Sequence, residues 1–296
     1  MSLTLWLPLG VAVLAGLSAA RLQRCLPPHV STLVLTVTAI ASALAVAWGL
    51  AIVAFGFVVQ VPTVADWAGW CHLALPGDDR VPTPVGMLSL VALAVAATRA
   101  WRWDHRVARL TSALSGYAGP VEILSMSEPT AFAVPGRPGH IVVSRALLDC
   151  LDDTDQAVLF AHERAHLDLR HHRYVHLADL AAAAVPILKP IAEQVRYATE
   201  RWADEVAVRA VGDRSTVAHA IARAALAVTS APPPLALGID GQVVARVEAL
   251  LEPRRTTAWF TAGSAAALAT AVVLVLASST VQLHHFVAYA AHVCRL

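Results

Sequence analysis

The stretch His162-Glu163-Arg164-Ala165-His166 (HERAH) determines the fold class that we expect, because it places two imidazoles four residues apart with a carboxylate beside the first. Residues four apart on a helix have Cβ atoms roughly 5–6 Å apart. Both Nε2 atoms can therefore reach one Zn²⁺ at about 2.0–2.1 Å. The pattern is an HExxH motif, in which the glutamate acts as general base on the attacking water. We predict that His162 and His166 bind one zinc ion and that Glu163 is the catalytic base.

The residues around this motif predict a helix. Asp153 followed by Gln156 is a capping-box-like helix start. Apolar residues then recur at helical spacing from Ala157 to Leu167, which gives the segment one long apolar face. HERAH is therefore expected inside a helix, as its ligand geometry requires.

A third ligand is expected from a second helix. A tetrahedral site with one open position needs three protein ligands, and Glu200 is the candidate, in a helix predicted between Pro190 and Gly212. Asp204 lies one turn after Glu200, where it can accept the Nδ1–H of a ligand histidine and fix its tautomer. For stabilisation of the oxyanion, Tyr197 and His176 are both open candidates.

At this point the chain resembles a family. Ala161–Leu167 (AHERAHL) with Glu200–Glu205 (ERWADE) is similar to the BlaR/MecR family of integral-membrane zinc metallopeptidases, whose relatives include the HtpX and CAAX-protease membrane enzymes. The resemblance implies a gluzincin-like α+β zinc-peptidase domain. Pro129–Val134 with His140–Leu148 is similar to the strand-turn-strand that lines the substrate cleft in these families, so Ala131, Phe132 and Ala133 are candidate cleft residues. Arg246, Val247, Leu250 and Leu251 match a downstream helix that closes the domain.

Composition predicts that this domain is tethered to a membrane. Hydrophobic residues make up 57% of the chain and charged residues only 15%, far from the values of a soluble domain. Four apolar runs without charge approach or exceed the about 20 residues that cross a bilayer core: Leu3–Ala20, Leu33–Val59, Pro84–Thr98 and Ala258–Ser279. We expect a mainly α protein with four transmembrane helices, the first a retained anchor, and the zinc domain inserted between the third and fourth.

The domain boundaries and the orientation follow from these runs. We expect three transmembrane helices in residues 1–98, the peptidase domain in 99–257, the fourth helix in 258–283 and a tail in 284–296. Arginines gather after the first and third runs, at positions 21, 24, 99, 102, 106 and 109. Because basic loops stay in the cytoplasm, we predict a multi-pass plasma-membrane protein whose catalytic domain is cytoplasmic and whose termini are outside.

Several other features have simpler interpretations. His171, His172 and His176 match no ligand spacing to the Glu200 helix, and we expect solvated or hydrogen-bonded helix residues there. Cys71 and Cys294 would both face the oxidising side, and a disulfide and two free thiols are both open. Residues 99–257 carry 18 basic and 18 acidic residues, which argues against direct nucleic-acid binding. A GxSxG elbow and a glycine-rich phosphate loop are both absent from the sequence.

The expected function is that of a zinc metalloendopeptidase that cleaves protein at the cytoplasmic side of the membrane. By resemblance, the substrate in regulated proteolysis and signal transduction is a transcriptional repressor or the chain itself. A homo-oligomer is an open possibility for the assembly of the chain. The sensors of the resembling family carry a penicillin-binding domain after the fourth crossing, where this chain ends, so we do not expect antibiotic binding by that route. Two other functions remain open: an HtpX-like quality-control protease and an inactive metal-binding scaffold.

Overall fold

The computed structural model describes residues 26–68, 81–114, 116–117, 119–229 and 240–252, with a few single positions between residues 10 and 20. Three predictions fall on other residues. The fourth expected span, Ala258–Ser279, lies outside the described residues, and so does more than half of the first, Leu3–Ala20. The same holds for both members of the Cys71–Cys294 alternative. Cys150, in contrast, is a free and exposed thiol.

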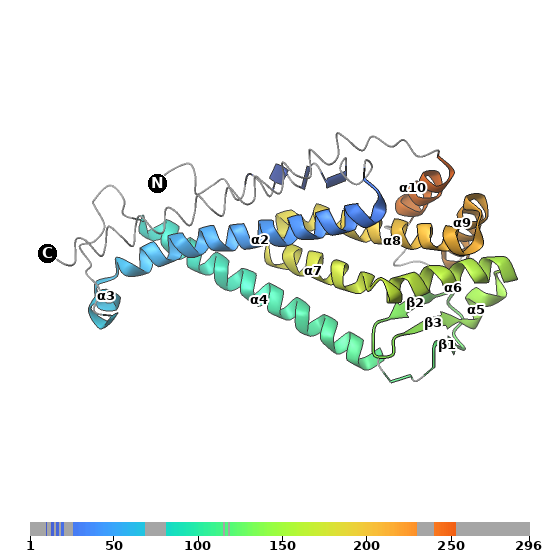
Figure 1. The fold of residues 1–296 in the computed structure, drawn as a ribbon. Helices are drawn as coiled ribbons and strands as arrows, with labels where there is room; N and C mark the ends of the chain where they lie inside the picture. The colour runs from blue at the N-terminus through green and yellow to red at the C-terminus, as the bar shows by residue number, and fades with distance from the viewer. Residues whose placement is uncertain are drawn as a thin grey trace.

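Two long apolar helices form the narrow end of the molecule. Helix α2 covers Pro28–Val59 and helix α4 covers Thr83–Leu114, each with 32 residues, and the short α3 (Pro62–Ala68) follows α2. At 1.5 Å per residue each long helix extends about 48 Å, which exceeds a hydrocarbon core of about 30 Å. Both are long and apolar enough to cross a membrane. Figure 1 shows them together at the narrow end and diverging toward the wide end.

Both helices extend beyond the apolar runs from which they were predicted. Helix α2 begins at Pro28 rather than Leu33, because a proline suits the first helical position. Helix α4 does not stop at Thr98 but continues through the arginine-rich segment to Leu114. Arginine, alanine and leucine are good helix formers, and no glycine or proline interrupts this segment. The basic residues after the third run therefore extend the helix instead of forming a loop.

A small three-stranded sheet lies at the wide end. Its strands are β1 (Val121–Leu124), β2 (Ala131–Val134) and β3 (His140–Ser144), in the order β1-β3-β2. Strand β1 runs parallel to β3 and β2 antiparallel to it. Because β3 is central and buried, β2 is an edge strand whose outer side does not pair with another described strand. The strand-turn-strand that the family resemblance implies corresponds to β2 and β3.

Helices complete the wide end. They are α5 (Arg145–Asp149), α6 (Asp153–Asp168), α7 (His171–Ala184), the 3₁₀ turn η3 (Pro186–Leu188), α8 (Lys189–Val211), α9 (Arg214–Thr229) and α10 (Asp240–Leu251). The N-cap of α6 is Asp152, not Asp153, because the Asp152 carboxylate accepts the N–H of Asp155 at 2.9 Å. Gln156 does not complete a capping box, since its amide donates to the carbonyls of Leu148 and Leu151. Helix α8 ends as predicted, at Gly212 with φ 87°.

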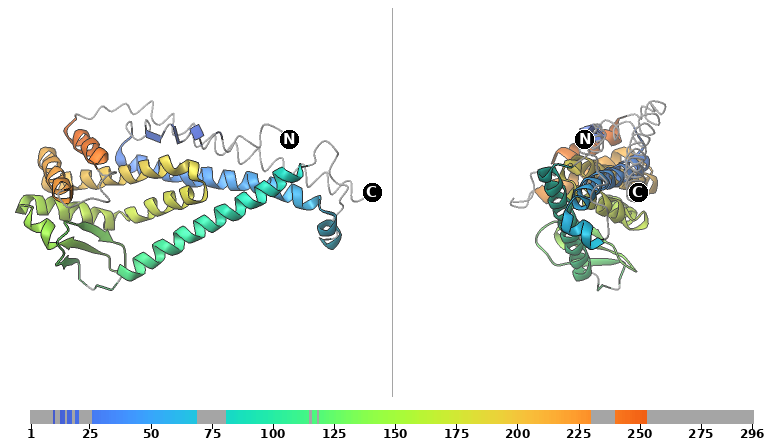
Figure 2. Two further views of the ribbon diagram at one scale, coloured as in Figure 1. Left: turned by 180° about the vertical axis from the view of Figure 1, so that it is seen from behind. Right: turned by 90° about the vertical axis from the view of Figure 1, so that its left-hand side faces the viewer.

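The hairpin of α7, η3 and α8 joins the two ends of the molecule. Its apolar residues Leu188, Ile191 and Val195 are fully buried and pack in one cluster with Leu35 and Ala39 of α2. Figure 2 shows the hairpin lying along α2 toward the narrow end. Burial of a leucine or isoleucine side chain contributes about 1.5–3 kcal/mol. This cluster therefore fixes helix α8, which carries Glu200, to the apolar helix α2.

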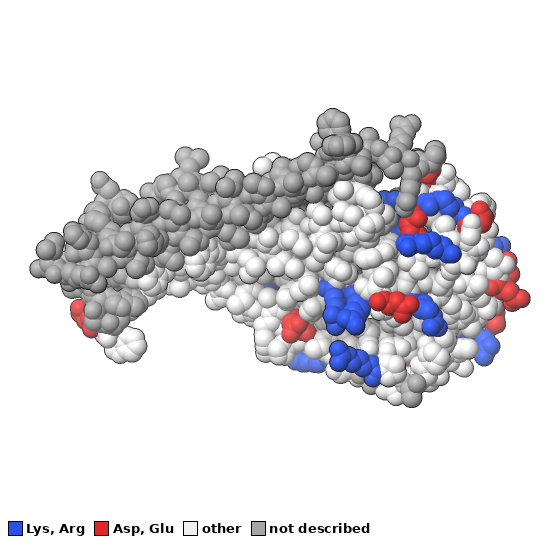
Figure 3. Space-filling view, in the orientation of Figure 1, with Lys and Arg blue, Asp and Glu red and all other residues white. Residues whose placement is uncertain are grey.

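Charged side chains are unevenly distributed. In the face shown in Figure 3, basic side chains and carboxylates gather over the wide end, where α6, α8, α9 and α10 lie. The described surface between this region and α3 is nearly free of them in the same view. A stretch of surface nearly free of charge is the distribution expected of helices that cross a membrane.

Candidate metal centre

Three of the predicted ligands meet in one place. Nε2 of His162 lies 3.1 Å from Nε2 of His166, and Glu200 approaches these two atoms at 3.3 and 3.5 Å with its two carboxylate oxygens. Three donors that bind one zinc ion tetrahedrally at about 2.0–2.1 Å stand about 3.3–3.4 Å apart. The donor set of His162, His166 and Glu200 thus fits zinc in both its chemistry and its spacing.

Helix geometry explains why these residues meet. His162 and His166 lie one turn apart on α6, and α8 crosses α6 so that Glu200 faces both imidazoles. His162 is largely buried, whereas the Glu200 side chain keeps 31% of its surface exposed. The open side of the donor set faces a cavity of about 390 Å³.

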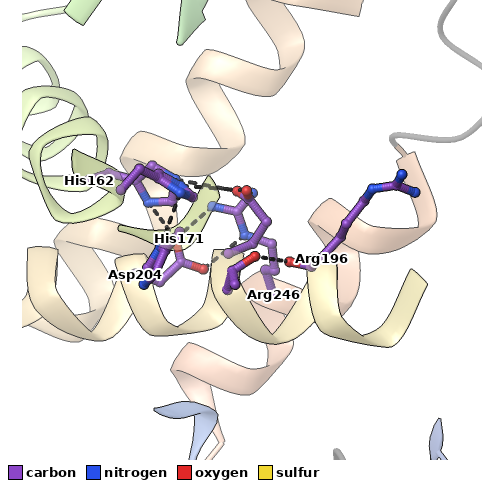
Figure 4. Close-up of polar contacts among 8 residues, drawn as sticks. His162, His171, Arg196, Asp204 and Arg246 are labelled. Carbon is purple, nitrogen blue, oxygen red and sulfur yellow. Dashed lines mark hydrogen bonds and ion pairs between the residues drawn. The ribbon is translucent and has the colours of Figure 1, made fainter. Parts of the chain in front are cut away.

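Asp204 lies where the sequence predicted, directly behind His162. Its Oδ1 is 3.0 Å from Nδ1 of His162, the ring atom that does not face the other donors. A carboxylate in this position orients the imidazole and raises its basicity. Figure 4 shows His162 and Asp204 facing each other from neighbouring helices.

Arg246 is a site residue whose role the sequence interpretation missed. From α10 it donates Nε and Nη2 to the two oxygens of Asp204 at 2.8 and 2.6 Å, and its Nη1 is 3.0 Å from Oε2 of Glu200 (Figure 4). One arginine therefore holds both the ligand Glu200 and Asp204, the carboxylate behind His162. A signal existed, because Arg246 interrupts an apolar face that includes Val243 and Leu250, and a charge on a core-facing stripe needs a partner.

His171 is the second unexpected neighbour of the centre. Its Nδ1 lies 3.1 Å from Nδ1 of His166, the side chain is fully buried, and its ring packs 5.0 Å from that of Trp202. The chain reaches this position because Arg170 adopts a left-handed conformation with φ 54° between α6 and α7. His171 is hydrogen-bonded, as expected, but it is neither solvated nor remote from the site.

Burial and charge shift the pKa values of these groups in opposite directions. Burial lowers the pKa of His162, but hydrogen bonds to Asp204 and Glu200 outweigh it and raise that pKa to about 10. Burial lowers the pKa of His166 to about 4. The Glu200 carboxyl has a pKa far below its usual range, because His162 and Arg246 outweigh its burial. Without a metal, the excess proton of the cluster therefore resides on His162.

Glu163 lies between the donor set and the edge strand. Its side chain is buried, and the backbone N–H of Ala133 in β2 donates to its carboxylate. Burial raises the pKa of Glu163 above its ordinary value, which moves this carboxylate toward the range of a general base. Strand β2 thus positions the base as well as lining the cavity, where Ala131, Phe132 and Ala133 all appear.

The two candidates for stabilising the oxyanion do not line the cavity. His176 points from α7 toward α4, with Nε2 3.1 Å from Oδ1 of Asp104. Tyr197 is half-buried and close enough to Arg246 to affect its pKa. Among the described residues that line this cavity, Arg196 is the one arginine or lysine, and it pairs with Asp179 at 2.6 Å.

Comparison with known proteins supports a metallopeptidase. Residues 102–188 match the model of Peptidase family M48. The chain is also similar to a protein described as "Protease HtpX homolog" from Aquifex aeolicus (strain VF5), with 29% identity over 94 residues. The aligned region is 31% of this chain and 31% of that protein, so the chain matches less than a third of the relative's length. No solved structure matches the chain.

The matched region covers only part of the site. It contains α6 with HERAH and the start of the hairpin, but it ends at residue 188, before Glu200, Asp204 and Arg246. The convergence of these three residues on the two histidines therefore rests on the structure and not on the family match. Together with the two apolar helices α2 and α4, these similarities support a membrane-associated metalloprotease.

Proposed function

We propose that the protein is a membrane-anchored zinc endopeptidase. The observation that carries the proposal is the spacing of the three donors, 3.1 to 3.5 Å, beside a buried glutamate at an edge strand. A catalytic zinc site leaves one position open for water or substrate, and here the open side faces the cavity lined by β2. An inactive scaffold would not need a base held at this point.

The reaction that these residues support is peptide-bond hydrolysis. Zinc bound by His162, His166 and Glu200 would act as a Lewis acid toward the scissile carbonyl. Glu163 takes a proton from the attacking water and passes it to the leaving amine. The outer edge of β2 can pair with an extended peptide, as edge strands do in strand addition. Asp204 holds His162 in the tautomer that directs Nε2 toward the metal.

The cellular role is proposed at a finer level. The active domain acts at the cytoplasmic face of the plasma membrane, where it cleaves a protein substrate in regulated proteolysis. The BlaR/MecR-like motifs AHERAHL and ERWADE favour a transcriptional repressor or the chain itself as substrate. The similarity to an HtpX homolog favours the second candidate, a quality-control protease of membrane proteins.

The enzymatic proposal is tested with the full chain in detergent micelles. Glu163→Gln should retain zinc and lose cleavage of casein, and Glu200→Gln should lose most of the zinc. Elemental analysis gives the metal content, and gel electrophoresis of casein gives the activity. Equal zinc content in Glu200→Gln and wild type would contradict the ligand assignment. Cleavage by Glu163→Gln at the wild-type rate would contradict the assigned base.

A second experiment separates the two cellular roles. Cells that produce Glu163→Gln should accumulate the uncleaved substrates, which quantitative proteomics can compare with cells that produce wild type. Accumulation of one cytoplasmic protein or of the chain itself supports regulated proteolysis. Accumulation of many unrelated membrane proteins supports quality control and contradicts the regulated role.

A further inference from the structure

A second cavity adjoins the candidate active site. It has a volume of about 300 Å³ and shares Pro135, Leu167 and His172 with the cavity beside the metal donors. The two cavities therefore adjoin at these three residues. The second cavity begins where β2 ends and is bounded by the turn between β2 and β3, by α6 and by the start of α7.

The lining of this second cavity is strongly basic. Four arginines, Arg137, Arg164, Arg170 and Arg173, line it together with one carboxylate, that of Asp168. The domain as a whole is not basic, since residues 99–257 carry 18 basic and 18 acidic residues. The positive charge is therefore a local property of the second cavity. We call these four arginines the basic cleft.

Within the described part of the chain, the arginines of the basic cleft form no ion pair with a carboxylate. Elsewhere in the domain Arg196, Arg214, Arg223 and Arg246 each form an ion pair with a carboxylate. Among the described residues, none of the four cleft arginines does so. Their field is also felt by His172, whose pKa is lowered first by burial and then by the charges of Arg173 and Arg170. A group of unpaired guanidinium groups around a hollow is suited to an anionic ligand.

We propose that the basic cleft binds acidic side chains of the substrate on one side of the scissile bond. This inference rests on the proposed peptidase function and adds the substrate class to it. The position of the basic cleft beside the metal cavity favours a peptide over a lipid headgroup, because a peptide paired with β2 would continue past Val134 toward these arginines. An extended chain advances about 3.3–3.4 Å per residue, so the acidic positions lie a few residues from the cleaved bond.

Binding to the full-length, zinc-loaded Glu163→Gln protein in micelles tests the proposal without requiring cleavage. Three pairs of fluorescent peptides share one apolar centre and carry Asp and Glu, Ser, or Lys. Within each pair, one peptide carries these residues on the N-terminal flank and the other on the C-terminal flank. Anisotropy should show the acidic peptide binding about tenfold more tightly than the lysine peptide, for one flank only. The difference should shrink as salt is raised, since exposed charges are screened.

Charge-reversal variants test the residues. Arg137→Glu and Arg173→Glu should each weaken binding of the acidic peptide about 3–10-fold and leave the serine peptide unchanged. The matched control is Arg145→Glu, an exposed arginine at the start of α5 that changes net charge equally but lies outside both cavities. Unchanged zinc content and melting temperature verify that the variants fold.

The outcomes separate this inference from the proposed function. If the acidic, serine and lysine peptides bind equally, or if Arg145→Glu and Arg137→Glu have equal effects, the basic cleft does not bind acidic substrate residues. Either result leaves the proteolytic function intact. Loss of binding to phosphatidylserine vesicles in Arg137→Glu and Arg173→Glu, with peptide binding unchanged, assigns the cleft to the membrane surface and also overturns the proposal. A clear acidic preference without casein cleavage by wild type contradicts the peptidase function but not the ligand class.

Discussion

Nδ1 of His166 lies 3.1 Å from Nδ1 of His171, on the side of the imidazole opposite the metal-facing Nε2. One of the two nitrogens must donate and the other accept. If Nε2 of His166 binds metal, its Nδ1 carries the hydrogen, so Nδ1 of His171 is the acceptor. Burial lowers the pKa of His171 to about 3, which keeps it neutral and able to accept. The two ligand histidines thus have different supports, Asp204 for His162 and His171 for His166.

The first prediction is that His171 acts through this acceptor. His171→Phe keeps a ring against Trp202 but removes the acceptor, and should weaken zinc affinity about 10–100-fold. His171→Asn places an amide oxygen near the position of Nδ1 and should restore most of the affinity. Competition with a chelator measures both variants. If His171→Phe binds zinc as tightly as wild type, the residue is only a packing element.

The second prediction concerns Arg246, whose side chain is 13% exposed between Glu200 and Asp204. Arg246→Met keeps much of the packing but leaves two carboxylates without their cation, and breaking a buried pair costs about 3–5 kcal/mol. The loss should be largest without zinc, because the metal supplies positive charge to the same carboxylates. Thermal unfolding with zinc and with EDTA measures the two losses.

A control for Arg246 is available on α8. Arg209 is exposed and donates to the backbone carbonyl of Glu205 in its own helix. Arg209→Met should change the melting temperature little under either condition. Equal losses for Arg246→Met with and without zinc would show that the arginine stabilises packing rather than the charge of the site.

The third prediction tests the connection between α2 and the hairpin. Leu35 is 1% exposed in the cluster with Leu188 and Ile191, so Leu35→Ala should destabilise the protein by about 2–5 kcal/mol. Leu44, on the same helix, is 60% exposed and should tolerate the same change. Thermal unfolding in micelles compares the two variants. A larger loss for Leu44→Ala would contradict the packing of α2 on α8.

Part of this site could be predicted from local sequence. The four-residue spacing of His162 and His166 and the helical period around it indicate ligands on one helix face, and Glu200 with Asp204 repeats that spacing on α8. Helix periodicity is encoded within a few residues, so α6 and α8 were predicted nearly to their ends. The cap of α6 was displaced by one residue because Asp152 and Asp153 are both capable N-caps.

Other parts depend on contacts that local sequence does not encode. Strand β2 has four residues, AFAV, which are too few and too uniformly apolar to show a two-residue period. Arg246 reaches Asp204 across 42 positions of chain. His171 faces His166 only because Arg170 turns the chain in a left-handed conformation. A non-glycine residue gives no sequence signal for that conformation. The positions of β2, Arg246 and His171 could therefore be found only from the three-dimensional structure.

The fourth prediction concerns the proton held by the metal-free site. His162 has a pKa of about 10 in the fold, above its ordinary value of 6.5, so its protonation stabilises the metal-free protein fully below about pH 6.5. That contribution is lost as pH rises through about 10. Because a zinc ligand must be a neutral imidazole, zinc binding displaces this proton. Zinc affinity should therefore rise up to about tenfold per pH unit between pH 7 and 10.

Calorimetry in buffers of different ionisation enthalpy measures the number of protons released. Glu163→Gln serves as the reference, because it removes the carboxyl at the site whose pKa is also raised. At pH 7 zinc binding to this variant should release about one proton from His162 for each zinc bound. A histidine of ordinary pKa would release about a quarter of a proton. Adding Asp204→Asn removes the charge 3.0 Å from Nδ1 of His162 and should lower the release. Equal release with and without Asp204→Asn would show that Asp204 does not hold the proton on His162.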